Sequence, residues 1–461
     1  MTHVVDVDYL VVGAGAMGMA FTDALIDHAE VSVAMVDRRH GVGGHWLEAY
    51  DFVRLHQASA FYGVASTLLG HSRLQQHGPE TGLQERATRA EICVYYERQA
   101  DRMIESGRVE LFTGCEYFED RSFVSRVSGE RFVVPEPCRI VNAHYLAPLI
   151  PAEKLPPFDI AHDARVIPVN DLVHLEEAPS QYVIVGSGKT ATDACIWLLA
   201  RGVDPDAISW ARPRDPWMLN RAVIQPDPAI FLGMVADTMQ AAEKASSLDD
   251  LFLRLEDAGI MLRIDRSVVP TMAKTPTLAE WELEALRTIE HVIRLGHIER
   301  VERSRVDFAS GSIPTADDAI VVHCAGEGLR YPPLVPVWSA EAITLQPIRA
   351  GFPCFGAALV GYVEATRDDD DDEKNRLCAP SPYSDSLAGW ARMTVLGARN
   401  AMSFASEPDI AAWASEVALN PARIPPVRTG SPELGDTLDR LQSHVRPGLA
   451  RLAEFGEVAP N

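Results

Sequence analysis

Short apolar runs that lead into glycine-rich turns occur twice along this chain, about 170 residues apart. The first spans Tyr9–Gly18 and the second spans Tyr182–Ala191. Each apolar run has the length of one buried strand, and a stretch with helical character follows each turn. The pattern therefore predicts two strand–turn–helix units, each of which opens a parallel α/β sheet.

The first turn has the glycine spacing of a dinucleotide site. Gly13 permits the tight turn, Gly15 lets the backbone approach a pyrophosphate, and Gly18 leaves room for the helix to pack on the strand. The next apolar run ends in Asp37, 19 residues after Gly18. A carboxylate near this spacing hydrogen-bonds the ribose of an adenosine with a free 2′-hydroxyl. Arg38 follows directly and is a further candidate contact.

The second turn is followed by positive rather than negative side chains. Gly186 and Gly188 match the first two glycines, and the next apolar run ends in Arg212. An arginine at this point accommodates a 2′-phosphate, which predicts NADP as the ligand. Lys189 and Thr190 stand at the helix start, where they can assist phosphate binding. The alternative is that the glycines serve only the turn and that Arg212 and its neighbour Arg214 are ordinary surface residues.

Between the two turns, the pattern predicts a helix, a strand and a hairpin. Thr88 and Glu91 form a capping box, and Gly107 supplies the helix end. The run 109–112 is typical of a strand, and alternation over 123–134 predicts a hairpin or meander.

After the second turn, residues 226–295 have mainly helical periodicity, with Thr275-Pro276 as the expected cap and first residue of one helix. Residues 297–308 predict a hairpin, and Ala319–Cys324 predicts a buried strand that returns to the first sheet. The acidic run 368–373 is expected to be a flexible surface loop, because like charges repel and stay solvated.

These elements predict an α/β fold with two Rossmann-like domains, the second nested within the first. Residues 1–150 would form the first part of one nucleotide-binding domain, and residues 165–318 the other, with a helical insertion at about 226–295. Residues 319–461 would complete the first domain and form a C-terminal tail. We expect the substrate pocket to be formed by the loop after Trp46, the insertion and this tail.

Composition favours a soluble enzyme. The chain has 461 residues, of which 47% are hydrophobic and 23% charged, and this is enough for two or three domains. A net charge of −23 argues against nucleic acid or an anionic membrane surface as a partner. No apolar run approaches the length of a membrane span and no leader segment opens the chain, so we expect a cytoplasmic protein. A homodimer is compatible with the chain.

The cysteine pattern bears on the class of chemistry. A flavin- and nicotinamide-dependent disulfide reductase needs a close cysteine pair, but the spacings C-x-x-C and C-x-x-x-x-C are both absent from the sequence. We expect inert thiols and no metal site. The seven cysteines are Cys93, Cys115, Cys138, Cys195, Cys324, Cys354 and Cys378.

The chain resembles the flavin-containing monooxygenase family in four features. These are the first turn with Asp37, the segment Gly43–Trp46, Tyr95 and Tyr96 on the predicted helix, and the second turn with its arginine. These class B flavoproteins bind two dinucleotides. The resemblance covers residues 6–115 and 180–215, and 319–328 more loosely. It implies FAD in the first domain, NADPH in the second, and a peroxyflavin that transfers one oxygen from O2 to a small-molecule nucleophile, with nitrogen or sulfur favoured. In the linker signature F-x-G-x-x-x-H, Ile160 and Ala164 replace the glycine and the histidine.

The resemblance also implies further cofactor contacts in the loop after the first domain's second strand. Gly44 lets the backbone lie close to a flat ligand, and His45 and Trp46 follow it, although Trp46 can equally be a core residue. Arg54 is a candidate in the same loop, as are His56 and Tyr62. No catalytic side chain is assigned, because the flavin carries the chemistry.

Two other functions stay open at this point. One is an NADPH-dependent flavoprotein reductase or dehydrogenase that does not transfer oxygen. The other is a non-catalytic sensor that binds a single nucleotide.

Overall fold

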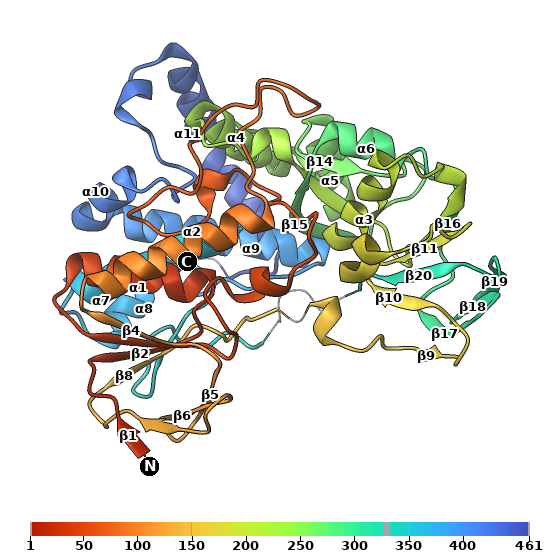
Figure 1. Ribbon diagram of the computed structural model, residues 1–461. Coiled ribbons are helices and arrows are strands. Elements are labelled where there is room, and N and C mark those ends of the chain that lie inside the picture. The colour runs from red at the N-terminus through yellow and green to blue at the C-terminus, as the bar shows by residue number, and fades with distance from the viewer. Residues whose placement is uncertain (1, 149, 326–331, 350, 460–461) are drawn as a thin grey trace.

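The computed structural model describes residues 2–148, 150–325, 332–349 and 351–459. Its centre consists of two five-stranded parallel sheets, one in each of two lobes (Figure 1). The first sheet has the order β21-β8-β2-β3-β4. Its strands are β2 (Tyr9–Val12), β3 (Val33–Val36), β4 (Val109–Phe112), β8 (Arg139–Asn142) and β21 (Ile343–Thr344).

In the first sheet, the strand order reverses between β2 and β8, so that chain order and spatial order follow the Rossmann pattern. Helix α1 (Ala16–His28) packs closely on α7 (Pro353–Thr366), where a Cβ at Gly361 would lie 2.4 Å from the carbonyl oxygen of Phe21. Helix α2 (Arg89–Glu105) has the predicted capping box, since Thr88 and Glu91 bond to each other's backbone. A four-stranded sheet adjoins this lobe and contains β1 (Thr2–Val4), β5 (Cys115–Phe118), β6 (Ser122–Ser125) and β7 (Arg131–Val133).

The second sheet has the order β10-β20-β11-β12-β16 and is also parallel. Helices α3 (Lys189–Ala200) and α6 (Glu280–Leu286) belong to this lobe and contact each other. The strands are β10 (Val166–Pro168), β11 (Tyr182–Val185), β12 (Ile208–Ala211), β16 (Val292–Ile293) and β20 (Ile320–His323). All five lie between β8 and β21 in the chain, and this confirms the nested arrangement of two Rossmann-like units.

One buried strand belongs to a different sheet from the one we expected. Residues 319–324 do form a buried strand, β20, but it pairs with β10 and β11 of the second sheet. The chain returns to the first sheet only at β21, which pairs with β8. A continuous apolar run indicates a strand that is buried on both faces, but it does not indicate which strands lie beside it. The sequence therefore did not show to which of the two sheets this strand belongs.

A smaller mixed sheet flanks the second lobe and includes the predicted hairpin over 297–308. The hairpin consists of β17 (Ile298–Glu302) and β18 (Arg305–Phe308). Strands β9 (Asp159–Ile160) and β19 (Gly311–Pro314) complete the sheet.

The predicted helix start at Thr275-Pro276 is wrong. Both residues lie in β15 (Met272–Leu278), which pairs with β13 (Pro216–Asn220) in a three-stranded sheet with β14 (Met261–Arg263). Their pairing skips from Lys274 to Thr277, so Pro276 occupies a bulge where no backbone donor is needed. The helix starts at Glu280 instead, where the Glu282 carboxylate accepts from the backbone N–H of Ala279 at 2.8 Å.

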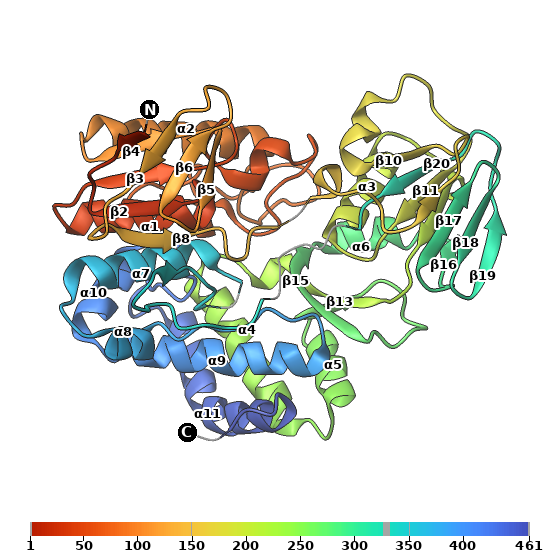
Figure 2. The same ribbon diagram turned by 90° about the horizontal axis from the view of Figure 1, so that it is seen from below.

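Three long helices gather on one side of the molecule (Figure 2). They are α4 (Pro228–Lys244), α9 (Leu387–Ala405) and α11 (Pro432–Phe455), with α11 packed against both others. Gly448 allows α11 to approach α4, because a Cβ there would lie 2.5 Å from the carbonyl oxygen of Met239. The shorter helices nearby are α5 (Leu248–Asp257), α8 (Asp371–Leu377) and α10 (Pro408–Glu416).

The acidic run 368–373 is not a loop throughout, because α8 begins within it. The Asp370 side chain caps this helix by accepting from the backbone N–H of Glu373 at 3.0 Å. Acidic side chains in a first helical turn are stabilised by the positive end of the helix dipole. None of the helices in the described ranges is long and apolar enough to cross a bilayer.

Candidate functional site

The first glycine turn borders a cavity of about 300 Å³. Its lining includes the β2–α1 turn, the end of β3 and the Gly44–Glu48 turn, together with residues within 115–117 and 143–148. The sequence analysis had selected six of these residues as cofactor contacts. They are Gly13, Gly15, Asp37, Arg38, Gly44 and His45.

Two glycine-containing segments meet backbone to backbone at this cavity. Gly13 has a φ of +112° and Gly44 a φ of +62°, both in the left-handed region that favours glycine. A Cβ at Gly44 would lie 3.0 Å from the Cα of Gly15. Gly18 lies one helical turn further, where a Cβ would come within 1.9 Å of the Gly13 carbonyl oxygen. Gly13 and Gly44 thus need glycine for conformation and Gly18 needs it for space, whereas a Cβ at Gly15 would lie in van der Waals contact with the Gly44 Cα at 3.5 Å.

Asp37 is buried at the end of β3 and faces the turn. One carboxylate oxygen accepts from the backbone N–H of Ala14 at 2.7 Å, and the other accepts from the backbone N–H of Arg39 at 2.8 Å. Each oxygen has a second lone pair free for a ligand hydroxyl. Arg38 and Arg39 both form ion pairs with Glu153, which fixes two cations at the rim of the cavity.

The loop after Gly44 contributes residues in different ways. His45 lines the cavity, and burial together with the nearby Arg39 lowers its pKa to about 4, so it is neutral at pH 7. Trp46 is buried beside the cavity, and its indole N–H donates to the Tyr62 hydroxyl at 2.7 Å. Tyr62 itself lines the cavity. Arg54 lies elsewhere, exposed at a separate hollow.

Several residues that line the cavity were not predicted from the sequence, among them Ala143 and His144 after β8 and Pro353 at the start of α7. No glycine or charge pattern marks these positions. The parallel pairing of β8 with β2 brings Ala143 and His144 to the turn.

The second glycine turn has a similar backbone. Gly186 has a φ of +133°, and Ala191 occupies the third position of the motif, its Cβ 3.5 Å from where a Gly186 Cβ would lie. A Cβ at Gly188 would meet no atom within 4 Å, so the turn faces open space. Lys189 forms ion pairs with Asp193 and Glu282.

Arg212 lies at the end of β12 as predicted, but inside the protein. It is 1% exposed, stacks on Trp210 with its guanidinium carbon 4.5 Å from the ring centre, and pairs with Asp215 at 2.8 Å. Two of its nitrogens, Nε and Nη1, have no hydrogen-bond partner. Arg214 is exposed. In this conformation Arg212 does not reach the surface on which a nucleotide would lie.

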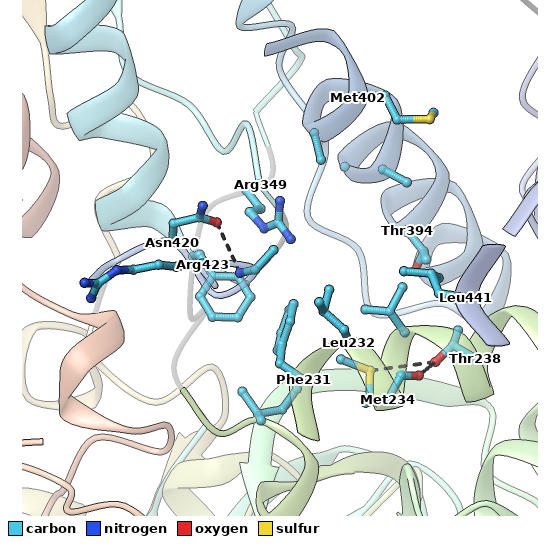
Figure 3. Close-up of a pocket in the computed structure, with 18 of the residues that line it drawn as sticks. Phe231, Leu232, Met234, Thr238, Arg349, Thr394, Met402, Asn420, Arg423 and Leu441 are labelled. Carbon is cyan, nitrogen blue, oxygen red and sulfur yellow. Dashed lines mark hydrogen bonds between the residues drawn. The ribbon is translucent and has the colours of Figure 1, made fainter. Parts of the chain in front are cut away.

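A second, larger cavity of about 560 Å³ lies among α4, α9 and α11 (Figure 3). It lies next to the first cavity at the start of α7, where Phe352 lines the larger space and the following residue, Pro353, lines the smaller. Gln57, from the loop after Trp46, lines it as well. The wall thus combines the loop, segment 226–295 and the C-terminal tail, as the sequence analysis predicted for a substrate pocket.

Other chemical groups are sparse. All seven cysteines are free thiols, and all but Cys93 are buried. Within the described ranges, the histidine, cysteine and acidic side chains form no cluster that could hold a metal ion.

Sequence comparison finds similar proteins in mycobacteria. No protein-family model matches it. Uncharacterized protein Rv2000 of Mycobacterium tuberculosis (strain ATCC 25618 / H37Rv) is 40% identical over 420 residues, covering 90% of this chain and 78% of that protein. Uncharacterized protein Mb2023 of Mycobacterium bovis has the same identity and coverage. The chain belongs to the family of these proteins.

Three solved structures are similar at 13–14% identity. The open crystal structure of cyclohexanone monooxygenase has a TM-score of 0.49 and covers 89% of this chain and 98% of its own. OTEMO in an FAD-bound form has a TM-score of 0.49, with 78% and 82% covered. Oxidized steroid monooxygenase bound to NADP has a TM-score of 0.44, with 98% of each chain covered.

Proposed function

We propose that this protein is an FAD-dependent oxidoreductase that consumes NADPH and oxygenates a small molecule. The observation that carries the proposal is the adjacency of two cavities. One is bordered by a dinucleotide-type turn with its buried carboxylate Asp37, and the other is large and apolar. The consecutive residues Phe352 and Pro353 line one cavity each, so a cofactor in the first would lie close to a substrate in the second.

The residues of the first cavity fit FAD. The N-terminus of α1, left open by Gly15, suits the pyrophosphate, and Asp37 suits the adenosine ribose. Tyr62 and Pro353 also line the cavity and would contribute aromatic and apolar surface to a flat ring. When bound, FAD supplies hydride acceptance and oxygen activation, and the protein supplies orientation and exclusion of water.

NADPH is assigned to the second turn. Gly188 leaves room for a pyrophosphate against the N-terminus of α3, whose first residue is Lys189. Arg212 remains the proposed 2′-phosphate contact, which requires it to leave Asp215, and the exposed Arg214 is the alternative.

Oxygenation is favoured over simple reduction by the character of the larger cavity. Its wall is mainly aliphatic and aromatic, and such a wall keeps water away from a reacting centre. Its described wall includes neither aspartate nor glutamate. A protonated amine would therefore lack a counter-charge, which favours a neutral sulfur or nitrogen as the atom that is oxidised.

We place the reaction in the cytoplasm, where thiols are kept reduced. The alternatives are an NADPH-dependent reductase without oxygen transfer and a non-catalytic nucleotide sensor.

The test has three stages. The purified protein should be yellow and release FAD, should oxidise NADPH faster than NADH, and should incorporate label from ¹⁸O2 into a thioether or neutral amine. A colourless protein that takes up no flavin would contradict every oxidoreductase reading. Flavin reduction without ¹⁸O incorporation for any soft nucleophile would favour the reductase.

A further inference from the structure

Arg349 is a cation without a counter-charge at the larger cavity. It lies between β21 and α7, is partly buried, and Figure 3 shows its guanidinium among the side chains that line the space. Its side chain makes no hydrogen bond or ion pair with any described residue. Its guanidinium lies over the ring of Phe231, at 5.9 Å from guanidinium carbon to ring centre.

No acidic group in the wall compensates this charge. The described residues that line the cavity include no aspartate, glutamate, lysine or histidine. Burial lowers the pKa of Arg349 to about 10, so the guanidinium stays protonated at pH 7. A cation in an apolar environment without a partner is unfavourable, and an anionic ligand would offset that cost.

The second arginine of the wall is arranged differently. The Nε of Arg423 donates to the carbonyl oxygen of Ser415 at 3.0 Å, and Figure 3 shows its side chain directed away from the cavity. Arg349 is therefore the cation that faces a ligand. Gln57 adds a neutral polar group to the wall: it is only 5% exposed, and its side-chain amide has no hydrogen-bond partner among the described residues.

The rest of the wall suits an apolar body. Leu232 and Met234 of α4, Leu441 of α11 and the alanine-rich face of α9 supply hydrocarbon surface. The volume of about 560 Å³ falls in the range of roughly 300–1,000 Å³ that is usual for small-molecule sites.

We propose that this cavity binds a molecule with an apolar body and a single carboxylate, held at Arg349. The planar guanidinium can donate two parallel hydrogen bonds to one carboxylate, which suits this group better than a neutral acceptor. The proposal rests on the proposed function in taking the cavity as the substrate site, but the binding step needs neither NADPH nor oxygen.

The test is calorimetric titration of the full-length, as-purified protein with decanoate, 1-decanol and decylamine. Decanoate should bind more tightly than decanol, and decylamine least. Arg349→Met should weaken decanoate roughly ten- to a hundred-fold, the loss expected for a charged hydrogen bond, and leave decanol unchanged. Arg349→Lys should retain part of the affinity. The matched control, Arg423→Met, should bind decanoate like the wild type.

Retained decanol binding shows that a variant is folded with its cavity intact. Equal decanoate affinity in wild type and Arg349→Met overturns the proposal, as does a preference for decanol or decylamine in the wild type. A protein that binds decanoate through Arg349 but takes up no flavin supports the carboxylate site and contradicts only the proposed function.

Discussion

At the first glycine turn the backbone of Gly15 packs against Gly44, while at the second turn the space next to Gly188 is open. The charged residues also differ. Asp37 accepts two backbone N–H groups at the edge of a cavity, whereas Arg212 is enclosed with Trp210 and Asp215. The motifs are alike and their φ angles are similar, so the difference comes from the segments that pack around each turn. The first turn is arranged for a ligand as it stands, and the second requires a rearrangement if Arg212 is to take part.

The largest effect is expected for valine at the second glycine of each turn. Gly15→Val should abolish flavin binding, because the branched side chain would enter the narrow space between the turn and Gly44 where a phosphate must lie. Gly188→Val should fold and retain flavin, because no protein atom lies within 4 Å of the new Cβ. It should lose affinity for NADPH, because the side chain would occupy the space proposed for the pyrophosphate. Flavin content by absorbance and NADPH titration measure the two losses.

A Gly15→Val protein that purifies with full flavin occupancy would remove FAD from this turn. Retention of NADPH binding by the same variant is the control for folding.

Arg212→Ala tests the charge difference between the turns. We expect the KM for NADPH to rise roughly ten- to a hundred-fold, the range of one charged hydrogen bond, with NADH kinetics nearly unchanged. Arg214→Ala, at the exposed neighbour, is the matched comparison. Equal losses with both coenzymes would identify Arg212 as a structural residue held by Asp215, and a larger NADPH effect at Arg214 would move the phosphate site there.

Substitution at the third position of the motif should reduce stability more in the first turn than in the second. Gly18→Ala places a Cβ 1.9 Å from the Gly13 carbonyl oxygen, so the turn must shift, at a cost of roughly 1–3 kcal/mol in stability. Ala191→Gly removes a Cβ that the second turn accommodates and should cost about 0.5–1 kcal/mol through helix propensity. Denaturant unfolding of both variants measures the difference, and equal values would contradict it.

The last prediction is a dependence of stability on pH through His45. Its folded pKa of about 4 lies below the usual value of 6.5, so between these values the unfolded chain binds the proton and the folded protein does not. Stability should therefore fall as pH decreases from 6.5 towards 4 and change little from this group above 6.5. His45→Asn should flatten that part of the profile, measured by unfolding at several pH values, whereas an unchanged slope would assign it to other groups such as His56.

The sequence by itself determined the local geometry of both turns. Steric limits on φ at Gly13 and Gly186 act within a few residues, and the capping box of Thr88 and Glu91 spans one helical turn. The length of the apolar runs predicted β2, β3, β4, β11, β12 and β20, and three residues of the first cavity, Gly13, Gly15 and Asp37, followed from motif spacing. Such features depend on neighbours in the chain, which a sequence displays directly.

Tertiary structure alone decided which distant segments meet. β20 joined the second sheet through pairing with β11, Pro276 fell in a bulge opposite β13, and Arg212 was enclosed rather than exposed. The environment of Arg349 was also decided by tertiary structure, because no sequence motif surrounds this residue. Its guanidinium faces apolar side chains of α4, which precedes it in the chain, and of α9 and α11, which follow it. Burial and pairing depend on what packs against a residue, and the local sequence does not specify that partner.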